Sequence, residues 1–146
     1  MAHESQRLPK GAEVSASLKN VGAITLFVED PQRSKAFYQE VFDLPVLFED
    51  ENSAVFKFDN TIINLLARRE APELIAPAAV ARPDAGSSFQ FSIWVDDTNA
   101  VCEQLAAHGV ELLNGPIDRV WGMRTATFTD PDGHIWEIAQ DLSKTA

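Results

Sequence analysis

The side chains most often used for nucleophilic or metal chemistry are few in this sequence and lie far apart. There is one cysteine, Cys102, and the three histidines are His3, His108 and His134. A single cysteine excludes an intrachain disulfide and a cysteine-based zinc site. Because Cys102 lies on a predicted helix among apolar neighbours, we expect a buried and unreactive thiol rather than a nucleophile.

Two arginines near a tryptophan are candidates for binding an anionic group. Arg119 and Arg124 flank Trp121 and Gly122, and a guanidinium can hold a carboxylate or an enolate oxygen with two hydrogen bonds. A structural ion pair is the alternative, because the chain has 22 acidic residues. Gly122 is typical of a turn or bulge, so alternation along the strand does not determine which face Arg124 occupies.

The segment Asp130-Pro131-Asp132-Gly133 resembles the beginning of a calcium-binding loop. It lacks the later acidic ligands of such a loop, so the sequence predicts a turn between two strands. His134 follows this turn, three residues before Glu137. Alternation along a strand therefore predicts that these two side chains occupy opposite faces.

Length and composition indicate one globular domain without a membrane span. The chain has 146 residues, of which 45% are hydrophobic and 23% charged, as is ordinary for a soluble domain with its own core. No apolar run approaches the roughly 18 residues of a membrane helix. Residues 1–20 are polar and contain no apolar signal segment, which predicts a flexible tail and a cytoplasmic protein.

The charge balance restricts the partners. With 12 Lys and Arg against 22 Asp and Glu, the net charge is −10 and the pI is about 4.6. Such a surface repels nucleic acids and anionic membranes, so neither is a predicted partner. It attracts cationic small molecules if the charge surrounds a cleft; the alternative is that it only keeps the protein soluble.

Each half of the chain predicts the same order of elements, strand–helix–strand–strand–strand. In the first half, Asp30 and Pro31 begin a helix that Pro45 ends. In the second half, Asp97 is the equivalent cap and Gly109 ends the helix. The predicted elements are strands at 21–29, 46–49, 54–58, 61–67, 89–95, 110–113, 124–129 and 135–139, with the first helix at 31–43.

This internal repeat predicts an α+β fold made of two βαβββ modules. Module one covers residues 21–69 and module two covers residues 87–141, with a proline-rich linker at 70–86. Neither module is large enough to hold a good core alone. Joined edge to edge, the strands would form one curved mixed sheet, a half-barrel with a cleft on its concave side and the helices on its convex side.

Three segments carry a resemblance to a known family. They are ITLFVEDPQRSKAFYQEVFDL, FSIWVDDTNAVCEQLAAHGVEL and FTDPDGHIWEIAQ. They resemble the glyoxalase/bleomycin-resistance/ring-cleaving dioxygenase (vicinal oxygen chelate) superfamily over about residues 21–141. The resemblance implies two βαβββ modules around a cleft, which many members complete as homodimers. It also implies one of two activities, metal-dependent catalysis or metal-free binding of a small molecule.

The resemblance further implies four positions for the ligands of a divalent metal (Zn, Ni, Mn or Fe). In this chain they correspond to Ala23, Asn64, Gln90 and Glu137. A methyl group cannot bind a metal, and neutral amides are poor replacements for imidazole or carboxylate. We therefore expect no metal. Glu137 remains the best catalytic candidate, as a general base, although it could instead anchor a cationic group or bond only to Gln90.

Alternation along the strands adds further residues to the predicted cleft. Thr25 and Phe27 share a face with Ala23, and Trp94 shares one with Gln90. Trp94 and Phe27 could stack on a planar or cationic ligand, or Trp94 could fill a collapsed cleft or a dimer contact. The predicted ligand-binding residues are Thr25, Phe27, Asn64, Gln90, Trp94, Trp121, Arg124 and Glu137.

The sequence thus predicts a homodimeric, metal-free protein that binds an aromatic or cationic small molecule in its cleft. The alternative is a metal-dependent enzyme with an atypical ligand set, either a glyoxalase-like lyase or isomerase or a ring-cleaving dioxygenase. A third hypothesis is a dimerisation module without any ligand.

Overall fold

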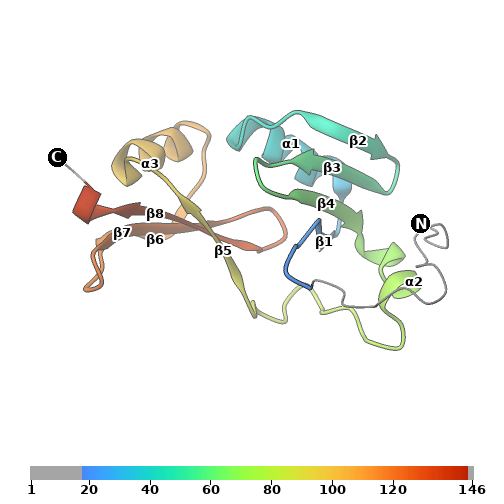
Figure 1. The fold of residues 1–146 in the computed structure, drawn as a ribbon. Coiled ribbons are helices and arrows are strands. Elements are labelled where there is room, and N and C mark those ends of the chain that lie inside the picture. Colours follow the sequence, from blue (N-terminus) through green and yellow to red (C-terminus); the bar gives the residue numbers. More distant parts are fainter. Residues whose placement is uncertain (1–17, 145–146) are drawn as a thin grey trace, which may run out of the picture.

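The computed structural model describes residues 18–144, so His3 and most of the predicted tail lie outside the described part. Module one contains β1 (Ile24–Val28), α1 (Pro31–Val41), β2 (Val46–Asp50), β3 (Ser53–Lys57) and β4 (Ile62–Ala67). Its strands form a four-stranded sheet in the order β1-β4-β3-β2, in which β1 and β4 are parallel and the other pairs antiparallel (Figure 1).

Module two repeats this arrangement. It contains β5 (Gln90–Trp94), α3 (Thr98–Ala107), β6 (Leu112–Asp118), β7 (Met123–Thr129) and β8 (Ile135–Asp141), with sheet order β5-β8-β7-β6. A 3-10 turn at Arg68–Glu70 and α2 (Pro72–Ile75) begin the linker, and another 3-10 turn at Leu142–Lys144 follows β8. No helix within residues 18–144 is long and apolar enough to cross a membrane.

Local sequence explains how each module's helix begins. Asp30 accepts hydrogen bonds from the backbone N–H groups of Gln32 and Arg33, and Asp97 accepts one from Ala100. These caps satisfy N–H groups that have no partner inside the helix. Gly109 lies beyond the end of α3 with a φ of +78°, a conformation that glycine adopts without strain.

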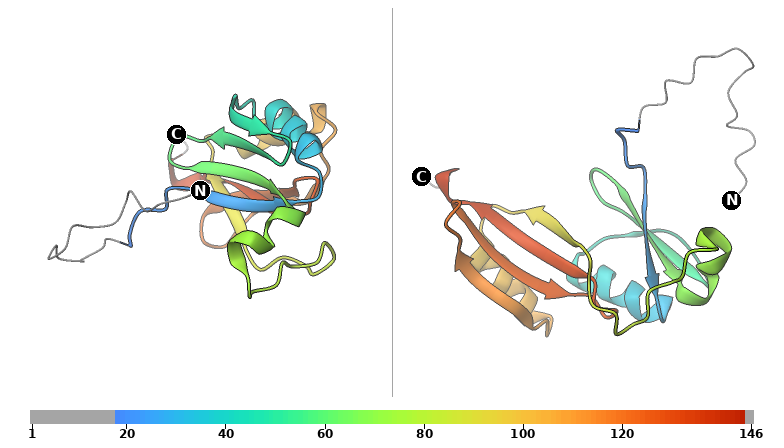
Figure 2. Two further views of the ribbon diagram at one scale, coloured as in Figure 1. Left: turned by 90° about the vertical axis from the view of Figure 1, so that its right-hand side faces the viewer. Right: turned by 90° about the horizontal axis from the view of Figure 1, so that it is seen from below.

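The hydrophobic core lies where the sheets meet the helices, and α1 connects the two modules. Tyr38 and Phe42, at the end of α1, contact the ring of Trp136 on β8, with centroids 6.0 and 4.9 Å away. Figure 2 shows α1 where the two sheets converge. Tyr38 is fully buried and Trp136 is 2% exposed. The two modules therefore share one core, as the limited size of each predicts.

The predicted turn at residues 130–133 is present and holds the modules together. Asp130 is 4% exposed, and one of its carboxylate oxygens accepts a 2.6 Å hydrogen bond from the Tyr38 hydroxyl. Asp132 accepts bonds from Ser34 Oγ at 2.9 Å and from the backbone N–H of Glu29 at 2.8 Å. These aspartates therefore serve a structural junction.

The structure confirms the α+β class and the two βαβββ modules, with one difference in how the sheets are joined. Within one chain, β1 and β5 are edge strands of separately hydrogen-bonded sheets, so the single curved sheet is not formed. The contacts of α1 with module two hold the sheets at an angle (Figure 2). Strand β6 extends to Asp118 rather than ending at 113, because its bulged pairing with β7 continues past Gly115.

Candidate functional site

Side-chain alternation gives each sheet one face against its helix and one open face. On β1, Leu26 and Val28 are buried in the core, which places Thr25 and Phe27 on the open face. On β4, Ile63 and Leu65 are buried, so Asn64 lies on the open face. Its amide nitrogen is 3.4 Å from Thr25 Oγ1, and its oxygen is buried without a hydrogen-bond partner within residues 18–144.

The open face of module two carries the more accessible polar groups. Gln90, Ser92 and Trp94 are all exposed along β5, and Glu137 lies beside Ser92 on β8. The Ser92 hydroxyl donates a 2.7 Å hydrogen bond to a Glu137 carboxylate oxygen. Thr127 on β7 pairs with Glu137 and has a buried hydroxyl without a partner in the described chain. The carboxylate, hydroxyl and amide groups on this face can accept hydrogen bonds from a ligand, and its amide group can also donate them.

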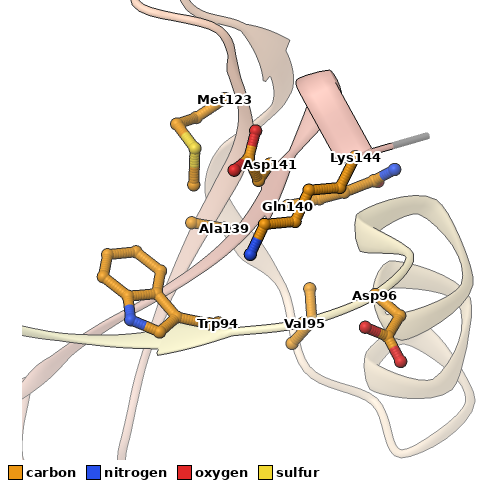
Figure 3. Close-up of a pocket in the computed structure, with 8 residues that line it drawn as sticks. All are labelled: Trp94, Val95, Asp96, Met123, Ala139, Gln140, Asp141 and Lys144. Carbon is orange, nitrogen blue, oxygen red and sulfur yellow. The ribbon is translucent and has the colours of Figure 1, made fainter.

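A cavity of about 610 Å³ lies at the end of this face (Figure 3). Figure 3 shows the indole of Trp94 and the side chain of Met123 on opposite sides of Ala139. The Trp94 side chain is 74% exposed, so its ring is available to a ligand. The volume falls within the range of small-molecule sites, and the mixture of apolar walls and a few polar groups is typical of them.

Two carboxylates and one ammonium line the same cavity. They belong to Asp96, Asp141 and Lys144. Hydrogen bonds from the side chain and backbone of Ser143 lower the pKa of Asp141, which therefore stays ionised at neutral pH. The three charges sum to −1, so the cavity is net acidic beside an exposed indole. That combination suits an aromatic cation.

The two candidate arginines occupy different faces. Arg119 donates from Nε to Thr125 Oγ1 at 2.9 Å, and its guanidinium lies 5.9 Å from the Trp121 ring centroid. No ion pair within residues 18–144 involves Arg119. Arg124, predicted as a ligand-binding residue, lies instead on the helix side beside Gln140 and forms an ion pair with Asp118 at 2.6 Å.

The ion pair between Arg124 and Asp118 explains the direction in which the pKa of each residue shifts. The hydrogen bond from Arg124 lowers the pKa of Asp118, and the same bond raises the pKa of Arg124. Arg124 is therefore paired with Asp118 away from the open face, and its role in ligand binding stays a prediction. Trp121 is 67% exposed in the turn between β6 and β7 and does not line the cavity at Trp94.

The four positions implied for a metal do not provide a suitable donor set. Ala23 has no donor atom, and Asn64 and Gln90 supply neutral amides. Glu137 is the single carboxylate and is already bonded to Ser92. No group of three or more His, Cys, Asp or Glu side chains within residues 18–144 could hold a metal. One negative donor is insufficient for a tightly held divalent cation.

The remaining reactive residues lie apart from the cavity at Trp94. Cys102 is partly buried on α3, and burial raises the pKa of its thiol, which disfavours the nucleophilic thiolate. His108 is the exposed residue that ends α3. His134 is 17% exposed and its Nδ1 lies 2.8 Å from Asp130 Oδ2.

Comparison with known proteins establishes the family. The model of the Glyoxalase/Bleomycin resistance protein/Dioxygenase superfamily matches residues 20–138. The chain is 33% identical over 123 residues to the uncharacterized protein YraH of Bacillus subtilis, covering 82% of this chain and 96% of YraH. The chain belongs to the Glyoxalase/Bleomycin resistance protein/Dioxygenase superfamily.

Three further similarities indicate the range of that superfamily. The chain is 25% identical to the metallothiol transferase FosB of Lysinibacillus sphaericus, over 84% of this chain and 82% of FosB. A glyoxalase-related enzyme from Fulvimarina pelagi has a solved structure with a TM-score of 0.73 and 27% identity, covering 84% of this chain and 88% of that one. A glyoxalase/bleomycin resistance protein/dioxygenase from Nocardioides shares the fold with a TM-score of 0.79 at 22% identity, covering 90% of this chain and 89% of that one.

Several residues of the cavity were absent from the predicted set. Met123, Asp96, Asp141 and Lys144 join Trp94 there because three strand ends and the final 3-10 turn converge. Alternation along β7 and β8 would have placed Met123 and Asp141 on the open face, since Met123 pairs with Asp141. No local sequence signal identifies Asp96 or Lys144.

Proposed function

We propose that this protein binds an aromatic or cationic small molecule beside Trp94, without a catalytic metal. The observation that carries the proposal is the net acidic cavity of about 610 Å³ with an exposed indole. A ring stacked on Trp94 gains dispersion and, if cationic, an electrostatic attraction to the indole face. Asp96 and Asp141 would favour the positive charge, and Met123 would adapt to the shape of the ring.

A second copy of the chain would complete the binding cleft. In one chain, the open faces of β1–β4 and of β5–β8 belong to separate sheets, and β1 and β5 each leave one edge unpaired. Exposed apolar side chains gather at the β6–β7 end of module two, where Val120 is 99% and Trp121 67% exposed. Large exposed apolar groups are typical of interaction surfaces. We expect light scattering to give about twice the chain mass of 16.1 kDa; a monomer would contradict the two-chain cleft.

The pairing of Ser92 with Glu137 supports a second candidate, catalysis by proton transfer. Glu137 lies on the open face, where it could accept a proton from a bound substrate, and Ser92 would orient its carboxylate. This candidate predicts that Glu137→Gln abolishes turnover while the protein stays folded. Elemental analysis of the purified protein tests the metal-dependent alternative, which requires about one divalent ion per chain.

A pair of isosteric ligands tests the binding proposal. We expect 1-methylquinolinium, an aromatic cation, to bind about tenfold more tightly than neutral 1-methylnaphthalene, because a cation–π contact and acidic neighbours act together. Fluorescence titration provides the dissociation constants. Trp94→Ala should weaken binding of the cation about tenfold, and Asp141→Asn should reduce the preference for the cation.

Phe48→Ala is the control, because Phe48 is an exposed aromatic residue on β2 that does not line the cavity. It should leave binding of 1-methylquinolinium unchanged. Equal losses in Trp94→Ala and Phe48→Ala would show non-specific adsorption on exposed aromatic side chains and would contradict the proposal. Equal affinity for the cation and its neutral isostere would contradict it as well.

A further inference from the structure

We propose a second ligand site, remote from Trp94, that takes a small hydroxylated carboxylic acid. It is a cavity of about 260 Å³ between β1, the linker and the turn that precedes β8. The linker passes beside the edge of β1 that has no partner strand (Figure 1). The cavity's aromatic walls are Phe27 and Phe89, and two of its polar groups are Arg68 and His134.

The hydrogen bonds around Asp130 determine which ring nitrogen of His134 is free. Trp136 Nε1 donates to the Tyr38 oxygen at 3.0 Å, so the Tyr38 O–H donates onward to Asp130 at 2.6 Å. Asp130 Oδ1 accepts the backbone N–H groups of Asp132 and His134, both at 2.9 Å. Asp130 is thus surrounded by donors and acts only as an acceptor.

The His134 Nδ1 must then carry a proton and donate it to Asp130 Oδ2, 2.8 Å away. A neutral imidazole with a proton on Nδ1 has a lone pair on Nε2. No hydrogen bond to Nε2 occurs within residues 18–144, and His134 lines the cavity. The ring is held firmly by a buried carboxylate on one side and presents an acceptor on the other. A ligand hydroxyl could donate to that acceptor.

Arg68 supplies the positive charge. Its Nη1 donates to the carbonyl oxygen of Ala81 at 2.6 Å, which fixes the guanidinium against the linker. Its Nε is buried and makes no hydrogen bond within the described chain, although a Glu29 carboxylate oxygen lies 3.5 Å away. Glu29 is 66% exposed at its side chain and can turn into solvent. A ligand carboxylate could take its place and form the bond that Nε lacks.

The other charges around the cavity are already engaged. The Asp132 side chain is 3% exposed, and its oxygens accept bonds from Ser34 and the Glu29 backbone. Arg82 is paired with Asp84 on the surface at 3.2 Å. Arg68 is therefore a cation at this cavity whose Nε is buried without a hydrogen bond in the described chain. Together with the acceptor on His134, it defines a ligand with one carboxylate and one hydroxyl, small enough for 260 Å³.

The carboxylate requirement is tested with benzoate probes. We expect at least one of 2-, 3- and 4-hydroxybenzoate to bind in calorimetry, and its amide to bind about tenfold more weakly, because the amide lacks the charge-assisted bond. Arg68→Gln should cause a similar loss. Arg69→Gln is the matched control, because the Arg69 guanidinium bonds to Asn52 and does not line the cavity. Equal losses in both variants, or equal binding of acid and amide, would overturn the proposal.

The hydroxyl requirement is tested by omitting that group. The best hydroxybenzoate should bind about tenfold more tightly than benzoate, and His134→Phe, which keeps a ring of similar size, should remove the difference. If His134→Phe does not fold, the hydroxybenzoate and benzoate affinities of the unaltered protein still test the proposal. Equal affinities for these two ligands would contradict the role of Nε2. Trp94→Ala should change neither result, which separates this site from the cavity at Trp94.

Discussion

The β3–β4 turn of module one and the β7–β8 turn of module two occupy equivalent places in the repeat but contact the opposite module in different ways. The first turn contributes the Phe58 ring, which stacks on Trp136 of module two with ring centroids 5.7 Å apart. Asp59 and Asn60 in the first turn are exposed, and the turn is closed by a bond from the Phe58 N–H to the Thr61 carbonyl. In the second turn, Asp130 is buried against Tyr38 of the other module. The repeat thus predicts two similar modules, while the contact between them buries the aspartate of the second turn and leaves Asp59 of the first turn exposed.

The same contrast applies to the open faces. On module one, Phe27 and Asn64 are partly covered, and the linker lines one end of that face. On module two, Gln90, Ser92 and Trp94 are all exposed. The same strand alternation thus produces a partly covered surface, one end of which the 70–86 linker lines, and an exposed surface along β5. The accessible surface is therefore the better place to seek the principal ligand.

The largest expected effect comes from neutralising the junction aspartate. Asp130→Asn should lower the free energy of unfolding by about 2–4 kcal/mol, because a buried acceptor of four hydrogen bonds is replaced by a group that also donates. Asp59→Asn, at the equivalent exposed turn, should change it by less than about 0.5 kcal/mol. Urea denaturation measures both. Similar losses in the two variants would mean that the turns do not differ as described.

The next effect is the response of the junction to alkaline pH. Burial, followed by the nearby Asp130, raises the pKa of Tyr38 far above its usual value of 10.0. The unfolded chain releases this proton near pH 10 and the folded chain keeps it. The contribution of Tyr38 to the free energy of unfolding should therefore be constant below pH 10. Above pH 10 the free energy of unfolding should fall by about 1.4 kcal/mol per pH unit.

Tyr38 is the single tyrosine of the chain, so its ionisation can be followed directly by ultraviolet absorbance. Tyrosinate absorbance should rise only when the protein unfolds, and Tyr38→Phe should remove this contribution to the alkaline loss of stability. Reversible ionisation of the folded protein near pH 10 would show that the junction opens easily.

A smaller loss is expected from the second junction contact. Ser34 is fully buried and donates to Asp132, so Ser34→Ala leaves a carboxylate oxygen without one partner and should cost about 1–2 kcal/mol. Ser143→Ala is the control, because Ser143 is exposed and its side chain bonds to the nearby Asp141 as its partner within residues 18–144. We expect a change below about 0.5 kcal/mol there. Thermal unfolding that gives the same shift for both would exclude a special role for Ser34.

The smallest expected difference between the two modules concerns their helix caps, because both modules have an aspartate at the N-terminus of the helix. Asp30→Ala and Asp97→Ala should each cost about 1 kcal/mol, because each carboxylate accepts hydrogen bonds from N–H groups at its helix terminus. The two losses should agree within about 0.5 kcal/mol in denaturant unfolding. A much larger loss at Asp30 would mean that its cap also supports the junction between the modules.

Much of the fold could be predicted because its signals are local. The caps at Asp30 and Asp97, the turn at 130–133 and the alternation on β1, β4, β5 and β8 all depend on neighbouring residues, and each corresponds to an observed element. The face of Arg124 could not be predicted, because the glycine turn before β7 obscures the phase of the strand. The length of β6 was also underestimated, since bulged pairing follows from its partner strand.

The candidate sites show the limit of local inference more clearly. Residue types alone indicated that Trp94 could stack on a ligand and that the positions implied for a metal lack suitable donors. Only the tertiary structure brought Met123, Asp96 and Asp141 to Trp94, or Arg68 and His134 to one cavity.

The sequence by itself determined the family, the two modules and the face of most strand residues, because hydrogen-bonded strands and capped helices depend on short-range patterns. The tertiary structure decided how the modules meet, which of two equivalent turns has a buried aspartate and which open face remains accessible. Those outcomes depend on packing between residues about 100 positions apart, such as Tyr38 and Trp136, which no local pattern encodes.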